Sequence, residues 1–325
     1  MIRMGILGAA KIAPKAVIDP VSRRDDCEIV CVAARDGAKA RAYADEHSIP
    51  EIAETYEALI ARPDIDLIYN ALPPNRHADL SIAAMEAGKA VLCEKPFAMN
   101  AAEARAMADA SVRTGRPLIE GFHYRHHPMF ADVLAQVRSG AIGKLCAIRS
   151  EFSVAIKYRP GELRHEPALG GGALMDLGCY ALHWARTVAG SEPRVASARA
   201  KLSPKGVDIT TTAKLEFDGG VTALVRTSMA ERQRYKALLA IQGSEGTLVA
   251  VNPLHPSMGH SITLRRGGTT RRYTVPGETT FDHQLAHVIS VLKTNAPPLT
   301  GGADAVANMA LIDAVYAAAG VARNV

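Results

Sequence analysis

Apolar runs and more polar, alanine-containing stretches alternate along the first third of the chain. The apolar runs predict buried strands and the stretches between them predict helices. The expected strands are 2–7, 28–34, 65–72, 90–93 and 117–121, and the expected helices follow Gly8 and cover 37–47, 77–87 and 100–114. Continuous rather than alternating apolar residues indicate a parallel sheet that is covered on both faces. We therefore expect α/β architecture with a doubly wound sheet.

Local signals predict where several of these helices begin and end. Pro14 is tolerated in a first helical turn, and Pro20 predicts the end of that helix. Asn100, followed three residues later by Glu103, resembles a capping box. Gly88 is expected to close the helix before it.

The pattern changes after about residue 143. A strand is expected at 145–154, and three glycines then open a helix that runs to residue 189. Hairpin signals follow, with a turn at 218–220 and strands at 195–202, 209–217, 221–228, 238–242 and 247–251. These strands predict an antiparallel meander. Helices at 281–294 and 303–319 close the chain, so we expect one domain over residues 1–122 and a second, α/β domain on an open, largely antiparallel sheet over 123–325.

Composition narrows the function classes. Two domains are the usual number for 325 residues, and the formal charge of +5 comes from 38 Lys and Arg against 33 Asp and Glu. No basic run carries interleaved aromatic residues, so nucleic acid is not an expected partner, whereas a small anion fits the charge. The five cysteines follow no metal-ligand spacing and predict reduced thiols. With no signal peptide and no membrane helix expected, we predict a cytoplasmic protein.

The turn after the first strand carries the first chemical signal. Its sequence, GAAKIA, stands where a G-x-G-x-x-G fingerprint belongs, with alanine at the second and third glycine positions. Small residues let main-chain amides approach a pyrophosphate at a helix N-terminus. The candidate cofactor contacts are Gly8, Ala9, Ala10, Lys11 and Ile12. The alternative is an ordinary βα turn.

The end of the second strand predicts which dinucleotide binds. NAD-preferring sites usually place a carboxylate here, but this chain has Ala34 followed by Arg35. A guanidinium can pair with a 2′-phosphate that a carboxylate would repel, and Lys39 can assist it. This favours NADP, with NAD still possible. The alternative is that both side chains are solvated on a loop.

Glu94-Lys95-Pro96 directly follows the strand 90–93. Ligands of doubly wound sheets bind beyond the carboxyl ends of the strands. A lysine there can polarise a carbonyl or hold a hydroxyl. The alternative is a surface Glu–Lys pair before a helix.

The glycine-rich segment 170–172 leads into a helix that carries Asp176 and Tyr180. Their spacing of four residues places them on one helix face. A carboxylate and a phenol together can bind a polyol and transfer a proton. The alternative is a flexible loop followed by a core tyrosine.

Three segments together resemble the Gfo/Idh/MocA oxidoreductase family, which includes glucose–fructose oxidoreductase and inositol dehydrogenases. They are GILGAAKIA, ALPPNRHADLSIAAMEAGKAVLCEKP and GGGALMDLGCYALH. The residues in these segments are similar to those of the branch that contains NADP-linked xylose and dihydrodiol dehydrogenases. The resemblance spans the chain, so residues 1–122 would be a dinucleotide-binding Rossmann domain and 123–325 a domain for substrate binding and oligomerisation.

The resemblance also implies roles for single residues. Lys95 matches the catalytic lysine of the family, and Asp176 would bind or orient the substrate. Many members have histidine where this chain has Tyr180, which would be the acid/base as in the xylose and dihydrodiol branch. Asn75 and His77 are expected to line the nicotinamide side of the cofactor, and the further candidate cofactor contacts are Ala71, Leu72, Pro73, Glu94 and Lys95 itself.

The resemblance also implies that the segment 120–128 lies at the cleft between the domains. Tyr124 and Arg125 are therefore candidate cofactor or substrate contacts, and we assign them to substrate binding. Three histidines in it, at positions 123, 126 and 127, suggest a metal, but they match no metal motif, so no metal site is expected. His165 is either a further substrate contact or an exposed loop residue.

These observations predict reversible hydride transfer between NADP(H) and a hydroxyl or carbonyl carbon of a sugar, polyol or trans-diol. Two alternatives remain: an NAD-dependent glycosidase of the same family, which Arg35 disfavours, and a non-catalytic sugar or dinucleotide sensor. The set Lys95, Asp176 and Tyr180 disfavours the sensor. The resemblance and the expected open sheet predict a homodimer or homotetramer.

Overall fold

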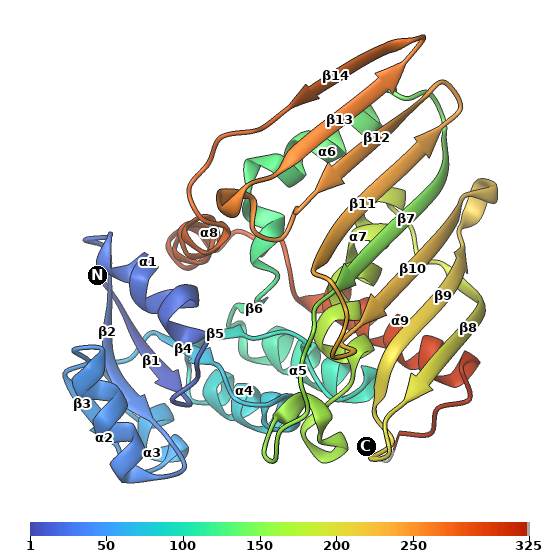
Figure 1. The fold of residues 1–325 in the computed structure, drawn as a ribbon. Coiled ribbons are helices and arrows are strands. Elements are labelled where there is room, and N and C mark those ends of the chain that lie inside the picture. The colour runs from blue at the N-terminus through green and yellow to red at the C-terminus, as the bar shows by residue number, and fades with distance from the viewer. Residues whose placement is uncertain (324–325) are drawn as a thin grey trace. The chain divides into compact units, whose positions relative to one another are not determined.

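The computed structural model describes residues 1–323 of the chain. They divide into two compact units, shown in Figure 1. The first unit contains Met1–His123 and Phe281–Val306, and the second contains Tyr124–Thr280 and the segment that begins at Ala307. The sequence analysis assigned residues 281–306 to the second domain. They cluster instead with the first unit, which is therefore built from two separate stretches of the chain.

A six-stranded parallel sheet forms the first unit, in the order β3-β2-β1-β4-β5-β6. The doubly wound parallel sheet is thus confirmed. Its strands are β1 (Ile2–Leu7), β2 (Cys27–Ala33), β3 (Glu51–Ala53), β4 (Leu67–Asn70), β5 (Ala90–Cys93) and β6 (Leu118–Glu120). Its helices are α1 (Asp19–Ser22), α2 (Gly37–Glu46), α3 (Tyr56–Ile60), α4 (His77–Glu86), α5 (Ala101–Thr114) and α8 (Thr280–Thr294).

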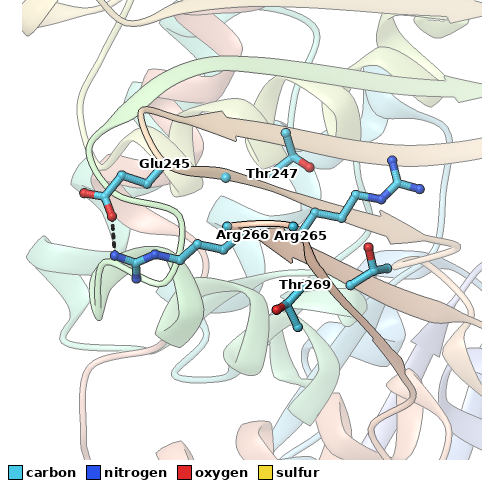
Figure 2. Close-up of a pocket in the computed structure, with 9 residues that line it drawn as sticks. Glu245, Thr247, Arg265, Arg266 and Thr269 are labelled. Carbon is cyan, nitrogen blue, oxygen red and sulfur yellow. Dashed lines mark hydrogen bonds and ion pairs between the residues drawn. The ribbon is translucent and has the colours of Figure 1, made fainter.

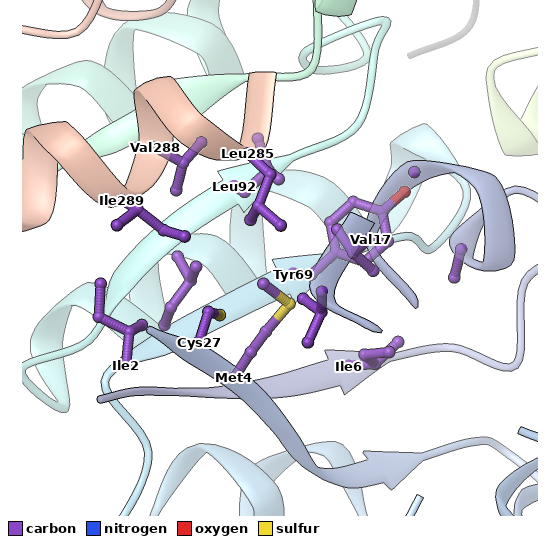
Figure 3. Packing of buried hydrophobic residues seen from close by; sticks show 14 of the residues in the cluster. Ile2, Met4, Ile6, Val17, Cys27, Tyr69, Leu92, Leu285, Val288 and Ile289 are labelled. Carbon is purple, nitrogen blue, oxygen red and sulfur yellow. The ribbon is translucent and has the colours of Figure 1, made fainter. Parts of the chain in front are cut away.

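Helix α8 joins the first unit because its apolar face completes that unit's core. Leu285, Val288 and Ile289 lie in one buried cluster with Met4 and Tyr69 of the sheet (Figure 3). Burying side chains of this size stabilises a fold by about 1.5–3 kcal/mol each. The sequence predicted the helix itself, but an amphipathic pattern does not state which sheet its apolar face will meet.

The helix after Gly8 differs from expectation at Pro20. A π-helical turn, Pro14–Ile18, comes first, and α1 then begins at Asp19. Pro20 is therefore in a first turn, where a missing N–H removes no helical hydrogen bond. The prediction that Pro20 ends the helix is wrong, because the change of helical register lets the chain continue to Ser22.

An eight-stranded, largely antiparallel sheet forms the second unit, in the order β14-β13-β12-β11-β7-β10-β9-β8. The open antiparallel sheet is thus confirmed. Its strands are β7 (Leu145–Ser153), β8 (Arg194–Leu202), β9 (Asp208–Glu216), β10 (Thr222–Ser228), β11 (Lys236–Gly243), β12 (Gly246–Val251), β13 (Ser261–Arg266) and β14 (Thr269–Tyr273). The helices of this sheet are α6 (Pro128–Arg138), α7 (Cys179–Ala189) and most of α9 (Gly302–Ala318).

One strand interrupts the meander that the sequence predicts. β7 lies between β10 and β11, parallel to β10 and antiparallel to β11. The expectation of one continuous meander is therefore wrong, because the first strand of this unit enters the sheet at its centre. Within this unit α6, α7 and α9 lie on one side of the sheet (Figure 1).

Several elements were not predicted, for a common reason. β3 and α3 are only three and five residues long, too short to show a period. α6 begins with a proline directly after the histidine-rich segment, which hides its amphipathic pattern. Four of the five residues of β14 are exposed, so the strand has no apolar face to recognise. Among the described residues, no helix combines the length and the apolar character that crossing a membrane needs.

Candidate cofactor and substrate sites

The turn after β1 is shaped by Gly8. Its φ of +100° is a conformation that side chains rarely adopt, and its N–H donates to the carbonyl of Ala33 at 2.8 Å. A Cβ at this position would lie 3.0 Å from Cδ2 of Leu72. The turn therefore requires glycine, as the fingerprint predicts.

The amides that follow this turn fit an anionic ligand. Within residues 1–323, the N–H groups of Ala9, Lys11 and Ile12 have no hydrogen-bond acceptor. They come directly before the helical stretch that begins at Pro14, and Lys11 and Ile12 are exposed. Open amides at the start of a helix hold phosphate oxygens well. The residues present thus suit the pyrophosphate of a dinucleotide.

Arg35 lies at the carboxyl end of β2, exposed and without an ion pair in the described part of the chain. The nearest carboxylate in the sequence, Asp36, is engaged elsewhere. Its Oδ1 caps α2 by accepting the N–H of Lys39 at 3.0 Å. The local charge is therefore suited to a 2′-phosphate rather than to bare ribose hydroxyls.

Asn70, which the sequence analysis did not single out, shapes the loop after β4. Its side chain is fully buried, with Nδ2 donating to Ser81 Oγ at 3.1 Å. Its Oδ1 accepts the N–H of Leu72 at 3.4 Å. Buried polar residues in a parallel strand are uncommon, so an asparagine at the end of an apolar run was the available signal. Through Leu72 it supports the 71–73 loop that was predicted to line the cofactor site.

Lys95 is half-buried immediately beyond β5, as predicted. Its neighbour Glu94 is buried, and Glu94 Oε1 accepts the hydroxyl of Tyr69 at 2.7 Å. The N–H of Lys95 donates to Glu94 Oε2 at 3.3 Å. Glu94 is therefore anchored to the sheet, and the main chain of Lys95 is anchored to Glu94.

His77 and Asn75 are placed very differently. Asn75 is exposed, whereas His77 is fully buried at the start of α4. Both ring nitrogens of His77 face main-chain oxygens: Nε2 lies 2.7 Å from Leu72 O, and Nδ1 lies 3.0 Å from Pro96 O. Burial lowers the pKa of His77, although its main-chain contacts act in the opposite direction.

Tyr180 lies on α7 in the second unit, after a π-helical turn at Leu174–Gly178 that carries Asp176. Only 4% of Tyr180 is exposed, and its ring packs edge-on against Phe152 at 5.7 Å and Tyr124 at 6.0 Å between ring centroids. These aromatic contacts restrict the ring to one orientation. The structure thus brings Tyr180 and Asp176 onto consecutive helical turns.

Asp176 is oriented by an arginine that sequence reasoning missed. Arg164 Nε donates to Asp176 Oδ2 at 2.7 Å, and Arg164 Nη1 donates to Glu162 at 2.9 Å. The charge of Asp176 is the largest influence on Arg164 and raises its pKa, against the effect of burial. An arginine in an irregular loop gives no periodic signal, so only the structure reveals this pair.

The other predicted substrate residues of this unit, Tyr124, Arg125 and His165, differ in their burial and in the groups that they contact. Tyr124 is fully buried, with its hydroxyl 2.5 Å from Nδ1 of His183, itself buried on α7. Arg125 is partly exposed, and its guanidinium carbon lies 5.3 Å from the ring centroid of Phe130. His165 is only 5% exposed, with Nε2 at 3.2 Å from Ile156 O, so it is not the exposed loop residue of the alternative interpretation.

Asp208 is a second residue that the sequence analysis missed. Its buried carboxylate accepts the N–H of Leu174 at 2.9 Å, the hydroxyl of Thr211 at 2.6 Å and that of Tyr316 at 2.7 Å. A Cβ on Gly172 would lie 2.3 Å from Asp208 Oδ1. The glycine-rich segment is thus required for close packing, and Asp208 fixes the start of the helical stretch that carries Asp176.

Two other features contain none of the predicted site residues. No cluster of three or more His, Cys, Asp and Glu side chains that could hold a metal ion occurs in residues 1–323. A hollow of about 270 Å³ lies at the tip of the β13–β14 hairpin, where Arg266 pairs with Glu245 (Figure 2). It is open to solvent. Its lining residues, 245–247 and 265–270, are far from Asp176 and Tyr180 in the sequence.

Comparison with known proteins relates the two units to established domain types. Residues 2–122 match the profile described as an oxidoreductase family with an NAD-binding Rossmann fold, and residues 130–249 match the GFO/IDH/MocA C-terminal domain. The D-xylose 1-dehydrogenase (NADP(+)) 2 of Haloferax volcanii is 34% identical, over 97% of this chain and 96% of that protein.

Two further proteins match most of the chain. The trans-1,2-dihydrobenzene-1,2-diol dehydrogenase of Xenopus tropicalis is 32% identical, over 85% of this chain and 82% of its own. A crystal structure of a 3-ketoreductase from Actinomadura kijaniata, in complex with NADP and TDP-benzene, superposes with a TM-score of 0.90. It is 25% identical and covers 98% of this chain and 97% of its own. The resemblance to the xylose and dihydrodiol dehydrogenase branch is thereby confirmed.

Proposed function

The chain belongs to the Gfo/Idh/MocA family of nicotinamide-dependent oxidoreductases, and we propose that its substrate is a sugar, polyol or trans-diol oxidised or reduced at a CH–OH carbon. The observation that carries this proposal is the fixed phenol of Tyr180 on the helical turn after Asp176. A carboxylate and a phenol suit a substrate that presents neighbouring hydroxyl groups. The named relatives act on a pentose and on a cyclic trans-diol, which share that feature.

NADP is the cofactor named for the Haloferax relative and present in the ketoreductase crystal structure. In this chain the first unit offers matching groups. The open amides of Ala9, Lys11 and Ile12 would hold the pyrophosphate, and Arg35 would pair with the 2′-phosphate. NAD lacks that phosphate, so it would gain nothing from Arg35.

The bound dinucleotide supplies the nicotinamide ring that accepts or donates the hydride. In the oxidative direction, Tyr180 receives the proton of the substrate hydroxyl as the hydride leaves the same carbon. Lys95, directly after β5, would hold the oxygen of the same hydroxyl with its ammonium group. The proposal therefore gives Tyr180 the proton and Lys95 the oxygen of the reacting hydroxyl.

The remaining candidate residues position the substrate. Asp176, oriented by Arg164, accepts a hydrogen bond from a second substrate hydroxyl. Tyr124 holds α7 through His183 and packs beside Tyr180, so its contribution is to fix the phenol. Arg125 and His165 are proposed to border the substrate.

Assembly into a homodimer or homotetramer is also proposed. α6, α7 and α9 lie on one side of the second unit's sheet. Leu202, Leu224 and Val251 on its strands are 38–44% exposed. Exposed apolar residues on an open sheet favour a partner surface. Sedimentation at micromolar concentration should give a multiple of 34.6 kDa, and a monomer mass would contradict the assembly.

A substrate panel tests the proposed reaction. D-xylose and other aldoses, inositols and trans-diols are each combined with NADP and with NAD, and formation of the reduced nicotinamide is followed by absorbance. We expect turnover of at least one compound with NADP, lost in Lys95→Ala measured in parallel. A nitrophenyl glycoside belongs in the panel. Its hydrolysis without net reduction of the cofactor would replace the proposal with a glycosidase, and tight NADP binding without any turnover would indicate a sensor.

A further inference from the structure

The segment 274–278, between β14 and α8, is held by one hydrogen bond. Within residues 1–323, the only hydrogen bond of this segment runs from the N–H of Val275 to Nε2 of His260, at 2.9 Å. Four of its five residues are exposed, and Val275 is half-buried. Shortly after it, between Thr280 and Phe281, the chain passes from the second unit into the first. His260 therefore restrains the main chain just before that crossing.

The two ring nitrogens of His260 have opposite roles. Nε2 faces the N–H of Val275, which can only donate, so Nε2 must be the nitrogen without a hydrogen. Nδ1 lies 2.9 Å from the carbonyl oxygen of Pro256, which can only accept, so Nδ1 must carry the hydrogen. One neutral imidazole satisfies both contacts at once, in the tautomer with its hydrogen on Nδ1.

The loop that carries this imidazole is itself fixed by Asn252. Asn252 Nδ2 donates to the carbonyl oxygens of His255 and Gly259, each at 2.8 Å. Asn252 Oδ1 accepts the hydroxyl of Tyr235 at 2.8 Å. The ring is thus mounted on a fixed loop, whereas the segment that it holds has no second hydrogen bond in the described part of the chain. Loss of the bond is therefore expected to free the segment rather than the loop.

A second proton on the ring reverses the role of Nε2. The imidazolium carries a hydrogen on both nitrogens, so Nε2 changes from an acceptor into a donor and can no longer accept the N–H of Val275. The contact with the carbonyl oxygen of Pro256 survives, because Nδ1 donates in either form. Protonation therefore breaks one of the two bonds and keeps the ring on its loop. Histidine is the side chain whose charge ordinarily changes between about pH 5 and about pH 8.

Several neighbouring elements contribute ionisable side chains around this contact. They are His127 and Asp132 from the start of α6, His255 from the loop, Arg271 from β14 and Glu278 from the segment itself. The ring centroid of His127 lies 6.4 Å from that of His260. Asp132 accepts the hydroxyl of Tyr273 at 2.7 Å. Within residues 1–323, none of these side chains is hydrogen-bonded or ion-paired to His260, so its two main-chain contacts are what protonation changes.

We propose that His260 is a pH-dependent latch: as the neutral imidazole it holds the segment 274–278 through Val275, and as the imidazolium it releases that segment. The inference goes beyond the proposed function, because it involves no cofactor or substrate residue. It makes the freedom of the chain just before α8 depend on pH.

Two substitutions remove the acceptor in different ways. His260→Phe keeps a planar ring but has no nitrogen on either side. His260→Asn keeps a donor near the position of Nδ1 and has no group at the position of Nε2. His287 on α8 provides the matched control, because its Nε2 accepts the N–H of Leu299 at 3.0 Å, a contact of the same kind with another segment.

Hydrogen exchange of the full chain measures the latch without any turnover. Protection is expressed relative to an unstructured peptide at the same pH, because exchange itself is catalysed by acid and base. From about pH 7.5 to about pH 5, protection in peptides covering 274–278 should fall by about tenfold, the scale of one lost hydrogen bond. In His260→Phe and His260→Asn this protection should already be low at the higher pH and should change little with acid.

The control and a second readout make the result decisive. His287→Phe should loosen 295–299 and leave the pH response of 274–278 intact. In proton–nitrogen correlation spectra of the histidine rings, the hydrogen of His260 should be on Nδ1 at neutral pH. A hydrogen on Nε2 there, protection of 274–278 that does not change with pH, or the same fall in His260→Phe would each overturn the inference. An equal fall in every peptide of the protein would overturn it too, since acid would then loosen the whole fold.

Discussion

The two units hold their candidate residues by different kinds of contact. In the first unit, main-chain groups of loops are prominent: the amides after Gly8 are open, and the buried ring of His77 faces the main-chain oxygens of Leu72 and Pro96. In the second unit, Asp176 and Tyr180 are held mainly by other side chains: Arg164 pairs with Asp176, and Tyr180 packs among aromatic rings. The proposed cofactor site thus depends mainly on the shape of loops, whereas the proposed substrate site depends on the identity of single side chains.

This difference predicts how each half responds to substitution. A cofactor that binds main-chain amides depends little on any one side chain, with Arg35 the exception because it would read the phosphate. Chemistry that depends on a single phenol is lost with that phenol. Substitutions at the proposed cofactor contacts should therefore change affinity in moderate steps, whereas substitution of Tyr180 or Lys95 should change turnover sharply.

The largest effect is expected for Tyr180→Phe. The ring keeps its contacts with Phe152 and Tyr124, but the proton acceptor is gone. Turnover should fall by about 100-fold or more, the usual scale for an acid/base group. NADP affinity, measured by calorimetry, should change little. Near-normal turnover would place the proton acceptor elsewhere, and His165 would be the next residue to replace.

Arg35→Ala should have the next largest effect. Loss of a charge-assisted hydrogen bond costs about 1.5–3 kcal/mol, so NADP affinity should fall by about 10- to 100-fold while NAD affinity stays the same. Lys39→Ala, one helical turn later, is the matched control and should have a smaller effect. Equal losses for both dinucleotides would show that Arg35 does not read the 2′-phosphate.

Asp208→Ala tests whether the substrate half depends on its side-chain network. The substitution leaves the donors of Leu174, Thr211 and Tyr316 without their acceptor, so the free energy of unfolding should fall by about 1–3 kcal/mol. Burial raises the pKa of Asp208, so its charged form is costly in the folded state at neutral pH. Asp208→Asn keeps an acceptor without that charge and should therefore be closer to wild type in chemical denaturation. An alanine variant as stable as the asparagine variant would contradict the role of the network.

Glu151→Gln should have the smallest effect, a loss of stability that depends on pH. Its buried carboxylate on β7 pairs with Arg226 at 2.7 Å and Lys236 at 2.8 Å. Burial raises the pKa of Glu151, but hydrogen bonds from Lys236 and Arg226 outweigh burial and leave it below its ordinary value. Glu151→Gln should therefore destabilise by about 1 kcal/mol at neutral pH, since both cations are partly exposed.

The sign of the pH dependence follows from the lowered pKa. The stabilisation from Glu151 is complete above the unfolded-state pKa of about 4.3 and disappears as the pH falls through the lower folded-state value. The difference between wild type and Glu151→Gln should therefore shrink in acid. Denaturation curves from neutral pH to about pH 3 measure it. A constant difference across that range would contradict the assigned ion pairs.

The same contrast explains what the sequence could predict. The apolar runs and the turn at Gly8 are local signals. They were therefore enough to predict the parallel sheet and a turn whose main-chain amides can approach a phosphate. The attachment of α8 to the first sheet was not predictable, because 157 residues of the second unit, Tyr124–Thr280, separate it from the rest of its core. The place of β7 at the centre of the second sheet also depends on strand pairings between distant segments.

Site residues follow the same rule. Lys95, Asp176 and Tyr180 belong to recognisable local motifs, whereas Arg164 and Asp208 lie outside them. Asp208 lies 34 residues from Leu174 and 108 residues from Tyr316 along the chain. A single sequence carries no signal for such contacts, because they arise only when the chain folds. Arg164 and Asp208, which orient or support the predicted site residues, were therefore the main omission from the predicted site.

The central proposal is that Lys95 and Tyr180 act on the same substrate hydroxyl, Lys95 on its oxygen and Tyr180 on its proton. A double-mutant cycle on turnover, with Lys95→Ala, Tyr180→Phe and both together, tests it most directly. Groups that act as a unit show strongly non-additive losses. We predict that the double variant loses far less than the product of the two single losses, with NADP affinity measured in each variant. Losses that simply multiply would show that the two residues act independently and would contradict the account.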